Sequence, residues 1–151
     1  MINIKRPYLT VLLFIVLVVT SLALNACDYI TGEAVKSPVL ARPQVVKDIT
    51  PEEANSILMF SSYIIYIIDV RTPEEYAGGH IEGAVNIDYY SASFKDEING
   101  LARDKIYLIY CRTGARSAGA RDIMKELDFQ NIYNMTGGIT AWVAKGLPVM
   151  K

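Results

Sequence analysis

Two short apolar runs, residues 63–68 and 106–110, constrain the fold of this 151-residue chain more than any other feature. Each run is too short for a free-standing helix. Such apolar, partly β-branched runs are typical of strands that are buried on both faces of a parallel sheet. Segments at 45–49, 84–87 and 131–135, in which apolar and polar residues are mixed, predict three further strands.

Signals for helix formation lie between these runs. The tetrapeptides 50–53 and 72–75 both read Thr-Pro-Glu-Glu. Each offers an N-cap threonine, a proline at the first helical position and a capping-box glutamate. The first of these helices is expected to bury Ala54, Ile57 and Leu58.

Two more helices are predicted in the second half of the chain. One has an apolar face with i, i+3, i+4 and i+7 spacing, formed by Ala120, Ile123, Met124 and Leu127. The last helix is expected to turn Ile139, Trp142 and Val143 inward and to end before Gly146 and Pro148. The alternation of strands and helices predicts an α/β fold with a mostly parallel central sheet flanked by helices.

The amino terminus has the layout of an export signal. Lys5 and Arg6 precede a charge-free apolar stretch at residues 7–26. Small Ala26 directly before Cys27 resembles a lipobox, which implies cleavage before Cys27 and attachment of lipid to its sulfur. The alternative is an uncleaved membrane helix, because the stretch approaches the roughly 20 residues that span a bilayer. Both interpretations predict a membrane-anchored domain outside the cytoplasm, in the periplasm or at the cell surface.

The chain is therefore expected to have three parts. Residues 1–26 form the signal peptide, residues 27–43 a tether that contains Gly32, Pro38 and Pro43, and residues 44–151 one domain. Outside the signal peptide there are 13 basic and 16 acidic side chains, and this balance argues against a nucleic-acid partner. With two cysteines and one histidine in the whole chain, the sequence predicts no metal site, and it indicates no cofactor.

The chemistry is expected in the loop at residues 110–117, which joins a predicted buried strand to the amphipathic helix. Open α/β sheets bind ligands at the carboxyl ends of their strands, and a loop that enters a helix points backbone N–H groups at its contents. Gly114 allows a tight turn, and Arg112 and Arg116 place two cations around Cys111. These groups favour the thiolate, and lowering a thiol pKa of about 8.5 by about two units makes it mostly ionised at about pH 7.

The alternative is that Cys111 is an unreactive cysteine of the hydrophobic core, but the glycine and two arginines around it are unusual in a core. We therefore interpret Cys111 as a reactive nucleophile. His80, the only histidine, follows a short predicted helix in a glycine-rich turn. Its expected role is structural hydrogen bonding rather than general-base catalysis.

Three ordered blocks resemble the rhodanese domain family over residues 45–149. They are the signature at 69–76 and 79–87, the loop at 110–117, and the closing Gly-Gly…Trp segment at 137–142 with 146–149. The resemblance implies a three-layer α/β fold. It also implies a thiolate that takes sulfane sulfur from a donor and passes it, as a persulfide, to an acceptor.

The family's residue roles transfer to matching positions of this chain. Cys111 would be the catalytic nucleophile and persulfide carrier, and Asp69 and Arg71 would brace the loop. The substrate-binding cradle would comprise Arg112, Thr113, Gly114, Ala115 and Arg116, with both arginines holding a small anionic donor. The implied donors are thiosulfate or polysulfide, and the implied acceptor is a thiol or cyanide.

Other functions of this fold stay open at the sequence level. One alternative is a rhodanese-fold phosphatase, because such phosphatases share much of the Gly-Gly-His-Ile signature, and arsenate reduction on the same fold is a weaker variant of it. The other alternative is a non-catalytic module that binds sulfide or another protein. The phosphatase relatives place five residues between cysteine and arginine, whereas four separate Cys111 from Arg116 here. The shorter loop favours a persulfide over a phosphoryl group. Because the chain has one such domain, and its loop differs from those of the tandem enzymes, the physiological donor stays open.

Overall fold

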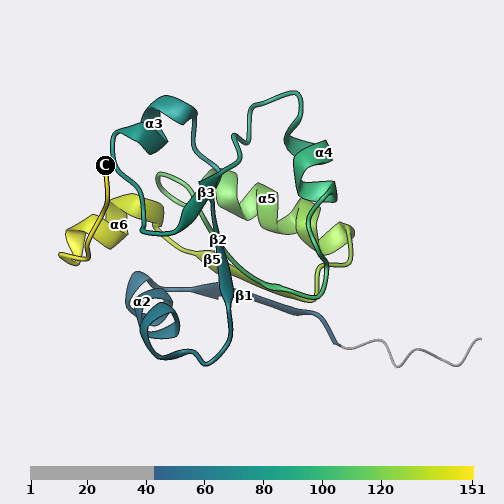
Figure 1. Ribbon diagram of the computed structural model, residues 1–151, viewed down its shortest axis with the longest axis horizontal. Coiled ribbons are helices and arrows are strands. Elements are labelled where there is room, and N and C mark those ends of the chain that lie inside the picture. The colour runs from purple at the N-terminus through teal and green to yellow at the C-terminus, as the bar shows by residue number, and fades with distance from the viewer. Residues whose placement is uncertain (1–42) are drawn as a thin grey trace, which may run out of the picture. The chain divides into compact units, whose positions relative to one another are not determined.

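The computed structural model describes residues 43–151 (Figure 1). The predicted signal peptide at 1–26, Cys27 and nearly all of the predicted tether lie outside the described residues. Within the described part, no helix is both long and apolar enough to cross a membrane.

The described residues form a five-stranded, all-parallel sheet with the strand order β1-β5-β4-β2-β3. The strands are β1 (Val45–Ile49), β2 (Ile65–Asp69), β3 (Ala84–Asn86), β4 (Ile106–Tyr110) and β5 (Asn131–Met135). The helices are α2 (Pro51–Phe60), α3 (Pro73–Ala77), α4 (Phe94–Asn99), α5 (Ala115–Glu126) and α6 (Gly138–Ala144). The predicted α/β fold is confirmed, and the sheet is entirely rather than mostly parallel.

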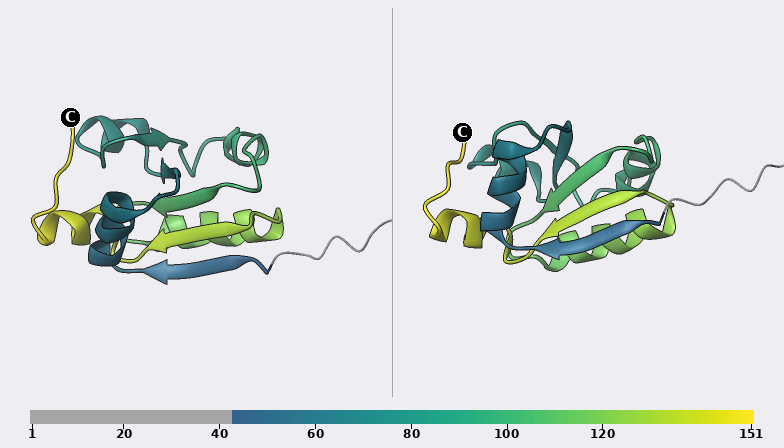
Figure 2. Two further views of the ribbon diagram at one scale, coloured as in Figure 1. Left: turned by 60° about the horizontal axis from the view of Figure 1, so that its bottom comes forward. Right: turned by 90° about the horizontal axis from the view of Figure 1, so that it is seen from below.

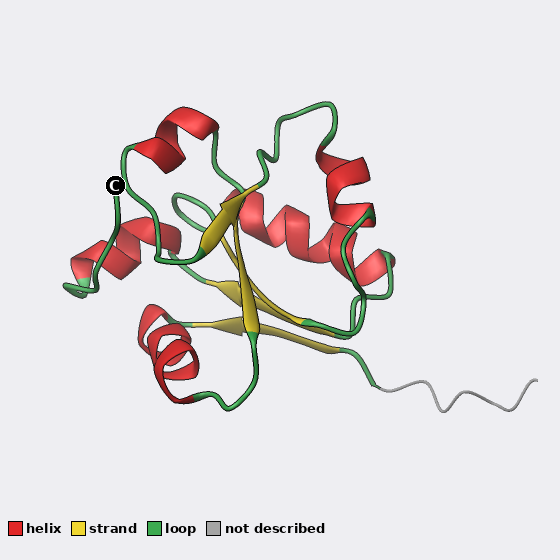
Figure 3. Ribbon diagram, in the orientation of Figure 1, coloured by secondary structure: helices red, strands yellow, loops and turns green. Residues whose placement is uncertain are grey.

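Helices cover both faces of the sheet (Figures 2 and 3). Ile109 in β4 packs with α4 and α5 in one core cluster, while Leu108 packs with α2 and α6 in the other. Consecutive residues of β2, Ile67 and Ile68, divide between the two clusters in the same way. Burial on both faces explains why these central strands have apolar runs instead of alternating patterns.

Both predicted capping boxes are present. The Thr50 hydroxyl accepts a hydrogen bond from the Glu53 N–H at 3.2 Å, and the Glu53 carboxylate accepts one from the Thr50 N–H at 2.8 Å. Thr72 and Glu75 repeat this exchange at the start of α3. Each pair satisfies two N–H groups that the first turn of a helix leaves without partners.

Several sequence predictions were wrong in detail. Tyr63 and Ile64 were expected to begin the second strand, but they precede β2 and are 73% and 77% exposed. Val143 was expected to face inward and is 53% exposed, whereas Ile139 and Trp142 of the same helix are buried. Helix α4 was not predicted, because its six residues have no N-cap hydrogen bond and too short a periodic pattern.

Candidate active site

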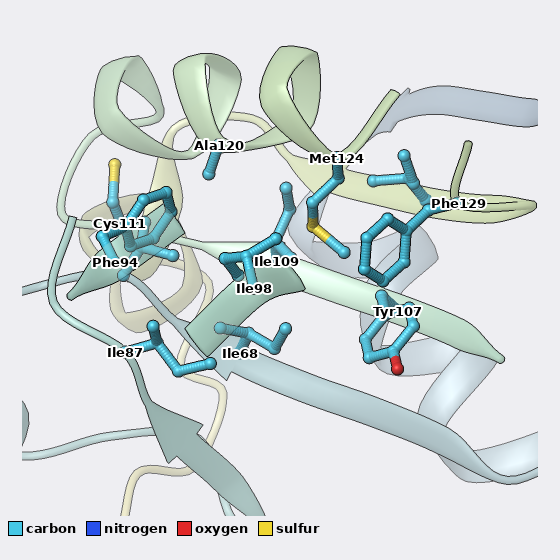
Figure 4. Close-up of a cluster of buried hydrophobic side chains, with 12 residues drawn as sticks. Ile68, Ile87, Phe94, Ile98, Tyr107, Ile109, Cys111, Ala120, Met124 and Phe129 are labelled. Carbon is cyan, nitrogen blue, oxygen red and sulfur yellow. The ribbon is translucent and has the colours of Figure 1, made fainter. Parts of the chain in front are cut away.

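The loop after β4 lies at the carboxyl edge of the sheet and holds the only cysteine among residues 43–151. Cys111 follows directly after β4 and carries a free thiol. It lies at one end of the core cluster beneath α4 and α5, and the residue is 1% exposed (Figure 4). Gly114 caps the amino end of α5 in the left-handed conformation, with φ of 105°, which a residue with a side chain rarely adopts.

Hydrogen-bond donors converge on the sulfur. The Gly114 N–H donates to Cys111 Sγ at 3.1 Å, and the Ser117 hydroxyl lies 3.6 Å from the same atom. Ser117 is fully buried, and its hydroxyl is also 3.1 Å from the Gly114 carbonyl oxygen. A hydroxyl has a single proton, so Ser117 can donate to the sulfur or to this carbonyl, and a negative sulfur attracts that proton more strongly.

The pKa of the Cys111 thiol reflects two opposing effects. Burial raises the pKa, because it penalises the charged thiolate. Hydrogen bonds from the Ser117 N–H and hydroxyl, and from the N–H groups of Gly114 and Thr113, lower it. The hydrogen bonds prevail, and the thiol pKa is lower than that of an ordinary cysteine. The loop therefore favours a nucleophilic thiolate.

Arg116 is held by an ion pair with α3. Its guanidinium donates two hydrogen bonds to the Glu75 carboxylate, at 2.7 and 2.9 Å, and both side chains are largely buried. The hydrogen bonds from Arg116 are the main reason that the pKa of Glu75 falls to about 2. The Arg116 guanidinium also lies 5.5 Å from the centre of the Tyr90 ring. Arg116 thus links the amino end of α5 to α3, while its charge still favours a negative Cys111.

Arg112 has a different environment. It is exposed and makes no ion pair with any residue in the described part of the chain. It borders a groove of about 470 Å³ between α3 and α6, whose wall includes Gly79, Thr140 and Val143. Of the two predicted donor-binding arginines, Arg112 is the one whose charge is available to an incoming anion.

Backbone N–H groups at the amino end of α6 form hydrogen bonds with the Cys111 loop. The Ile139 N–H donates to the Cys111 carbonyl oxygen at 2.8 Å, and the Thr140 N–H donates to the Arg112 carbonyl oxygen at 3.1 Å. Gly138 makes this approach possible. A Cβ atom at position 138 would lie 2.6 Å from the Arg112 carbonyl carbon and closer still to the Cys111 carbonyl oxygen.

Asp69 and Arg71 form a buried ion pair with a shortest distance of 2.6 Å. The Arg71 guanidinium also donates to the Gly79 carbonyl oxygen at 2.7 Å and lies 5.8 Å from the centre of the Tyr110 ring. The pair therefore joins the end of β2 to the turn before His80 and to the residue that precedes Cys111. This geometry agrees with a supporting rather than a reacting role.

His80 takes part in structural contacts. Its ring stacks on Tyr76 at a centroid distance of 3.9 Å, and its Nδ1 lies 3.1 Å from the Tyr76 carbonyl oxygen. Its backbone exchanges two hydrogen bonds with Met150. Trp142 is likewise structural: it is 2% exposed, and its indole N–H donates to the Pro148 carbonyl oxygen.

The structure brings together the loop residues from Cys111 to Arg116 and adds three contributors that the sequence analysis missed. Ser117 lay in the matched motif but was not assigned to the site. Glu75 was recognised only as a capping residue, and nothing in the sequence indicates its pairing with an arginine 41 positions later. Gly138 belonged to the matched Gly-Gly segment, but its contact with the loop depends on how β5 and β4 pair. Among residues 43–151 no three His, Cys, Asp or Glu side chains are grouped as a metal site would require.

Comparisons with known proteins agree with this geometry. Residues 50–145 match the family described as the rhodanese-like domain. The chain is 33% identical over 86 residues to a sulfurtransferase of Allochromatium vinosum, covering 57% of this chain and 78% of that protein. It is 33% identical over 96 residues to the thiosulfate sulfurtransferase GlpE of Pseudomonas entomophila, covering 64% of this chain and 84% of the relative. A rhodanese-like domain protein from Staphylococcus aureus superposes with a TM-score of 0.59 at 33% identity, over 70% of this chain and 99% of that structure.

Proposed function

Since the chain belongs to the rhodanese-like domain family, we propose that it is a sulfurtransferase in which Cys111 carries the transferred sulfur as a persulfide. The observation that supports this most strongly is the set of donors directed at one sulfur atom. The Gly114 N–H and the Ser117 hydroxyl both approach Cys111 Sγ, and the thiol pKa is lowered although the residue is buried.

In the first step, the Cys111 thiolate attacks the outer, sulfane sulfur of a donor such as thiosulfate. A sulfur–sulfur bond forms to Cys111 while the one inside thiosulfate breaks, and sulfite leaves with the electron pair. Arg112, exposed beside the loop, attracts the anionic donor. The backbone N–H groups of the loop and the positive end of α5 stabilise the negative persulfide that results.

In the second step, a nucleophilic acceptor attacks the outer sulfur of the persulfide. With cyanide, a carbon–sulfur bond forms, thiocyanate leaves, and the electron pair returns to Cys111 as thiolate. No proton has to be delivered to the leaving thiolate, because the loop already favours the charged sulfur. This mechanism needs neither a metal nor a general base.

The same loop argues against phosphatase activity. Four residues separate Cys111 from Arg116, and the Arg116 guanidinium already donates two hydrogen bonds to the Glu75 carboxylate. A phosphoryl group would need room for three oxygens and an acid to protonate the leaving alkoxide. Displacing a reacting group by about 1 Å can cost about a hundredfold in rate. We therefore expect sulfur transfer to far exceed phosphate hydrolysis.

The test measures thiosulfate-to-cyanide transfer and aryl phosphate hydrolysis on one preparation of the full chain. Cys111→Ser should abolish the transfer and leave the fold intact, because the side chain changes little in volume. Phosphate hydrolysis that depends on Cys111, with no thiocyanate from any sulfur donor, would refute the proposed function.

We also propose that the domain acts at a membrane, outside the cytoplasm, with Cys27 as a lipid-modified mature amino terminus. The proposal rests on Ala26-Cys27 closing a positively charged and then apolar leader. Each methylene buried in the bilayer contributes about 0.8 kcal/mol, so more than one acyl chain would hold the domain firmly. Intact-mass analysis of detergent-extracted protein decides between the two anchors. A lipidated chain beginning at Cys27 supports the proposal, and an unmodified chain beginning at Met1 supports the uncleaved helix.

A further inference from the structure

Exposed apolar side chains gather in one short segment, far from the candidate active site. Within six residues, Met59 is 67% exposed, Phe60 81%, Tyr63 73% and Ile64 77%. They are four of the five most exposed large apolar side chains among residues 43–151. Large exposed apolar patches on proteins mark sites that contact a partner or a membrane.

This segment connects the end of α2 to the start of β2. Next to it, a groove of about 470 Å³ continues the apolar surface onto the sheet. Phe60 and Tyr63 line this groove. Ile65 and Ile106, the first residues of β2 and β4, also line it, as does Tyr133 in the middle of β5. We call residues 59–64 together with this groove the amino-edge surface, because it lies where the strands begin.

The chain also enters the described domain at the amino edge. Val45, at the start of β1, is in register with Asn131, which is in register with Ile106, which is in register with Ile65. Three strand spacings of about 4.8 Å therefore place Val45 about 14 Å from the start of β2. The predicted tether, residues 27–43, ends just before Val45 in the sequence. Random-coil statistics for a segment of that length give an end-to-end distance of about 20–25 Å, which would allow this edge of the sheet to reach a bilayer.

We propose that the amino-edge surface rests on the lipid bilayer to which the chain is attached. The proposal builds on the proposed membrane attachment and adds which face of the domain meets the lipid.

The charge pattern favours lipid over a protein partner. No charged residue occurs from Ala54 to Ile68, although 21% of the whole chain is charged. Lys47 in β1 forms an ion pair with Glu53, and Lys105, which directly precedes β4, forms one with Asp104. Phe and Tyr side chains next to Ser61 and Ser62 suit the boundary between acyl chains and headgroups, where amphipathic aromatic rings gather. Contact should therefore not require anionic lipids.

This orientation has a consequence for the reaction. Cys111 follows the carboxyl end of β4, and β4 begins at Ile106 beside the amino-edge surface. Cys111 is five residues beyond Ile106, and at about 3.3 Å per residue it lies about 16 Å from the start of β4. With its amino edge on the lipid, the domain presents the Cys111 loop to the aqueous phase, where anionic donors are dissolved.

The experiment compares two tryptophan variants of the full chain, reconstituted in phosphatidylcholine vesicles with brominated acyl chains. Tyr63→Trp places a reporter in the amino-edge surface. Val85→Trp places one at another exposed apolar position, 61% exposed, on β3. Both variants keep the buried Trp142 as an identical background. We expect bromine to quench the fluorescence of the Tyr63→Trp reporter at least twofold more strongly than that of the Val85→Trp reporter.

Equal quenching of the two reporters, in protein that floats with the vesicles and transfers sulfur, would overturn the amino-edge contact and leave the proposed function standing. A blue shift in the emission of the Tyr63→Trp reporter without bromine quenching would show that a second copy covers the surface, and would also overturn it. Protein that does not float with the vesicles would refute both the anchor and the contact. Sulfur transfer is measured separately, so its loss is not confused with any of these results.

Discussion

Replacing Gly138 with alanine should displace the Cys111 loop and slow sulfur transfer, although it replaces no side chain that takes part in the reaction. Gly138 begins α6, has a φ of 58°, and lies directly beneath the loop. An added Cβ would lie 2.6 Å from both the carbonyl carbon and the carbonyl oxygen of Arg112, and it would meet the Cys111 carbonyl oxygen as well. These are backbone atoms, so no side-chain rotation can relieve the contact.

The magnitude follows from this geometry. Restoring an ordinary contact of 3.4 Å to the Arg112 atoms requires the loop or α6 to move by about 0.8 Å, and the closer Cys111 carbonyl oxygen requires a larger movement. A displacement near 1 Å at a reacting centre costs on the order of a hundredfold in rate. The hydrogen bonds from Ile139 and Thr140 to the loop carbonyls would weaken at the same time. We expect kcat/KM for thiosulfate-to-cyanide transfer to fall by about a hundredfold.

Gly83→Ala is the matched control. Gly83 also has a positive φ, 77°, but a Cβ there would meet nothing within 4 Å. Both variants carry a left-handed alanine, which costs about 1–2 kcal/mol of stability. Only the Gly138 variant should also lose transfer. Urea unfolding and transfer assays of both proteins separate the two effects. If Gly138→Ala transfers sulfur as fast as Gly83→Ala, the argument from loop position is wrong.

Three further predictions concern the charges around the loop. Ser117→Ala removes a hydrogen-bond donor that stabilises the thiolate, so the pKa of Cys111 should rise, as measured from the pH dependence of alkylation by iodoacetamide. The exposed Ser62→Ala variant should leave that pKa unchanged. Arg112→Ala should raise KM for thiosulfate about tenfold and leave kcat nearly unchanged in steady-state assays. An unchanged KM would show that Arg112 does not bind the donor. The pKa of Glu75 is about 2 when folded and 4.5 ordinarily, so its pairing with Arg116 stabilises the fold fully above about pH 4.5 and is lost as the pH falls toward 2. Urea unfolding across this pH range should show that the Glu75–Arg116 pair contributes at most about 3 kcal/mol to the free energy of unfolding, and the Glu75→Gln variant should lack this pH-dependent contribution. An equally steep fall in the free energy of unfolding of that variant would contradict the assignment.

The sequence predicts the framework well because its signals are local. The bounds of β4 follow from a five-residue apolar run, the predicted segment 131–135 is the whole of β5, and both capping boxes follow from four consecutive residues. Exposure at the ends of elements is less predictable. Tyr63 and Val143 are apolar by type, but whether each is covered depends on which distant element packs there.

In the candidate site, too, the sequence indicates the local motif but not the distant residues that contact it. Cys111 and the loop that follows it form one continuous motif, so the sequence alone indicates them. The partners that fix the loop come from other parts of the chain: Glu75 from α3, and Gly138 with Ile139 from the start of α6. Their contacts depend on the strand order, which places β4 between β5 and β2. That order is a property of the fold and cannot be obtained from the spacing of residues in the sequence.

The central claim is that Cys111 carries sulfur, and mass spectrometry of the protein after exposure to thiosulfate tests it most directly. The account predicts that the peptide containing Cys111 becomes heavier by one sulfur atom, and that cyanide restores its original mass as thiocyanate appears. Cys111→Ser should show neither change. A wild-type chain that stays unmodified with thiosulfate and with polysulfide, while its fold is intact, would contradict the account.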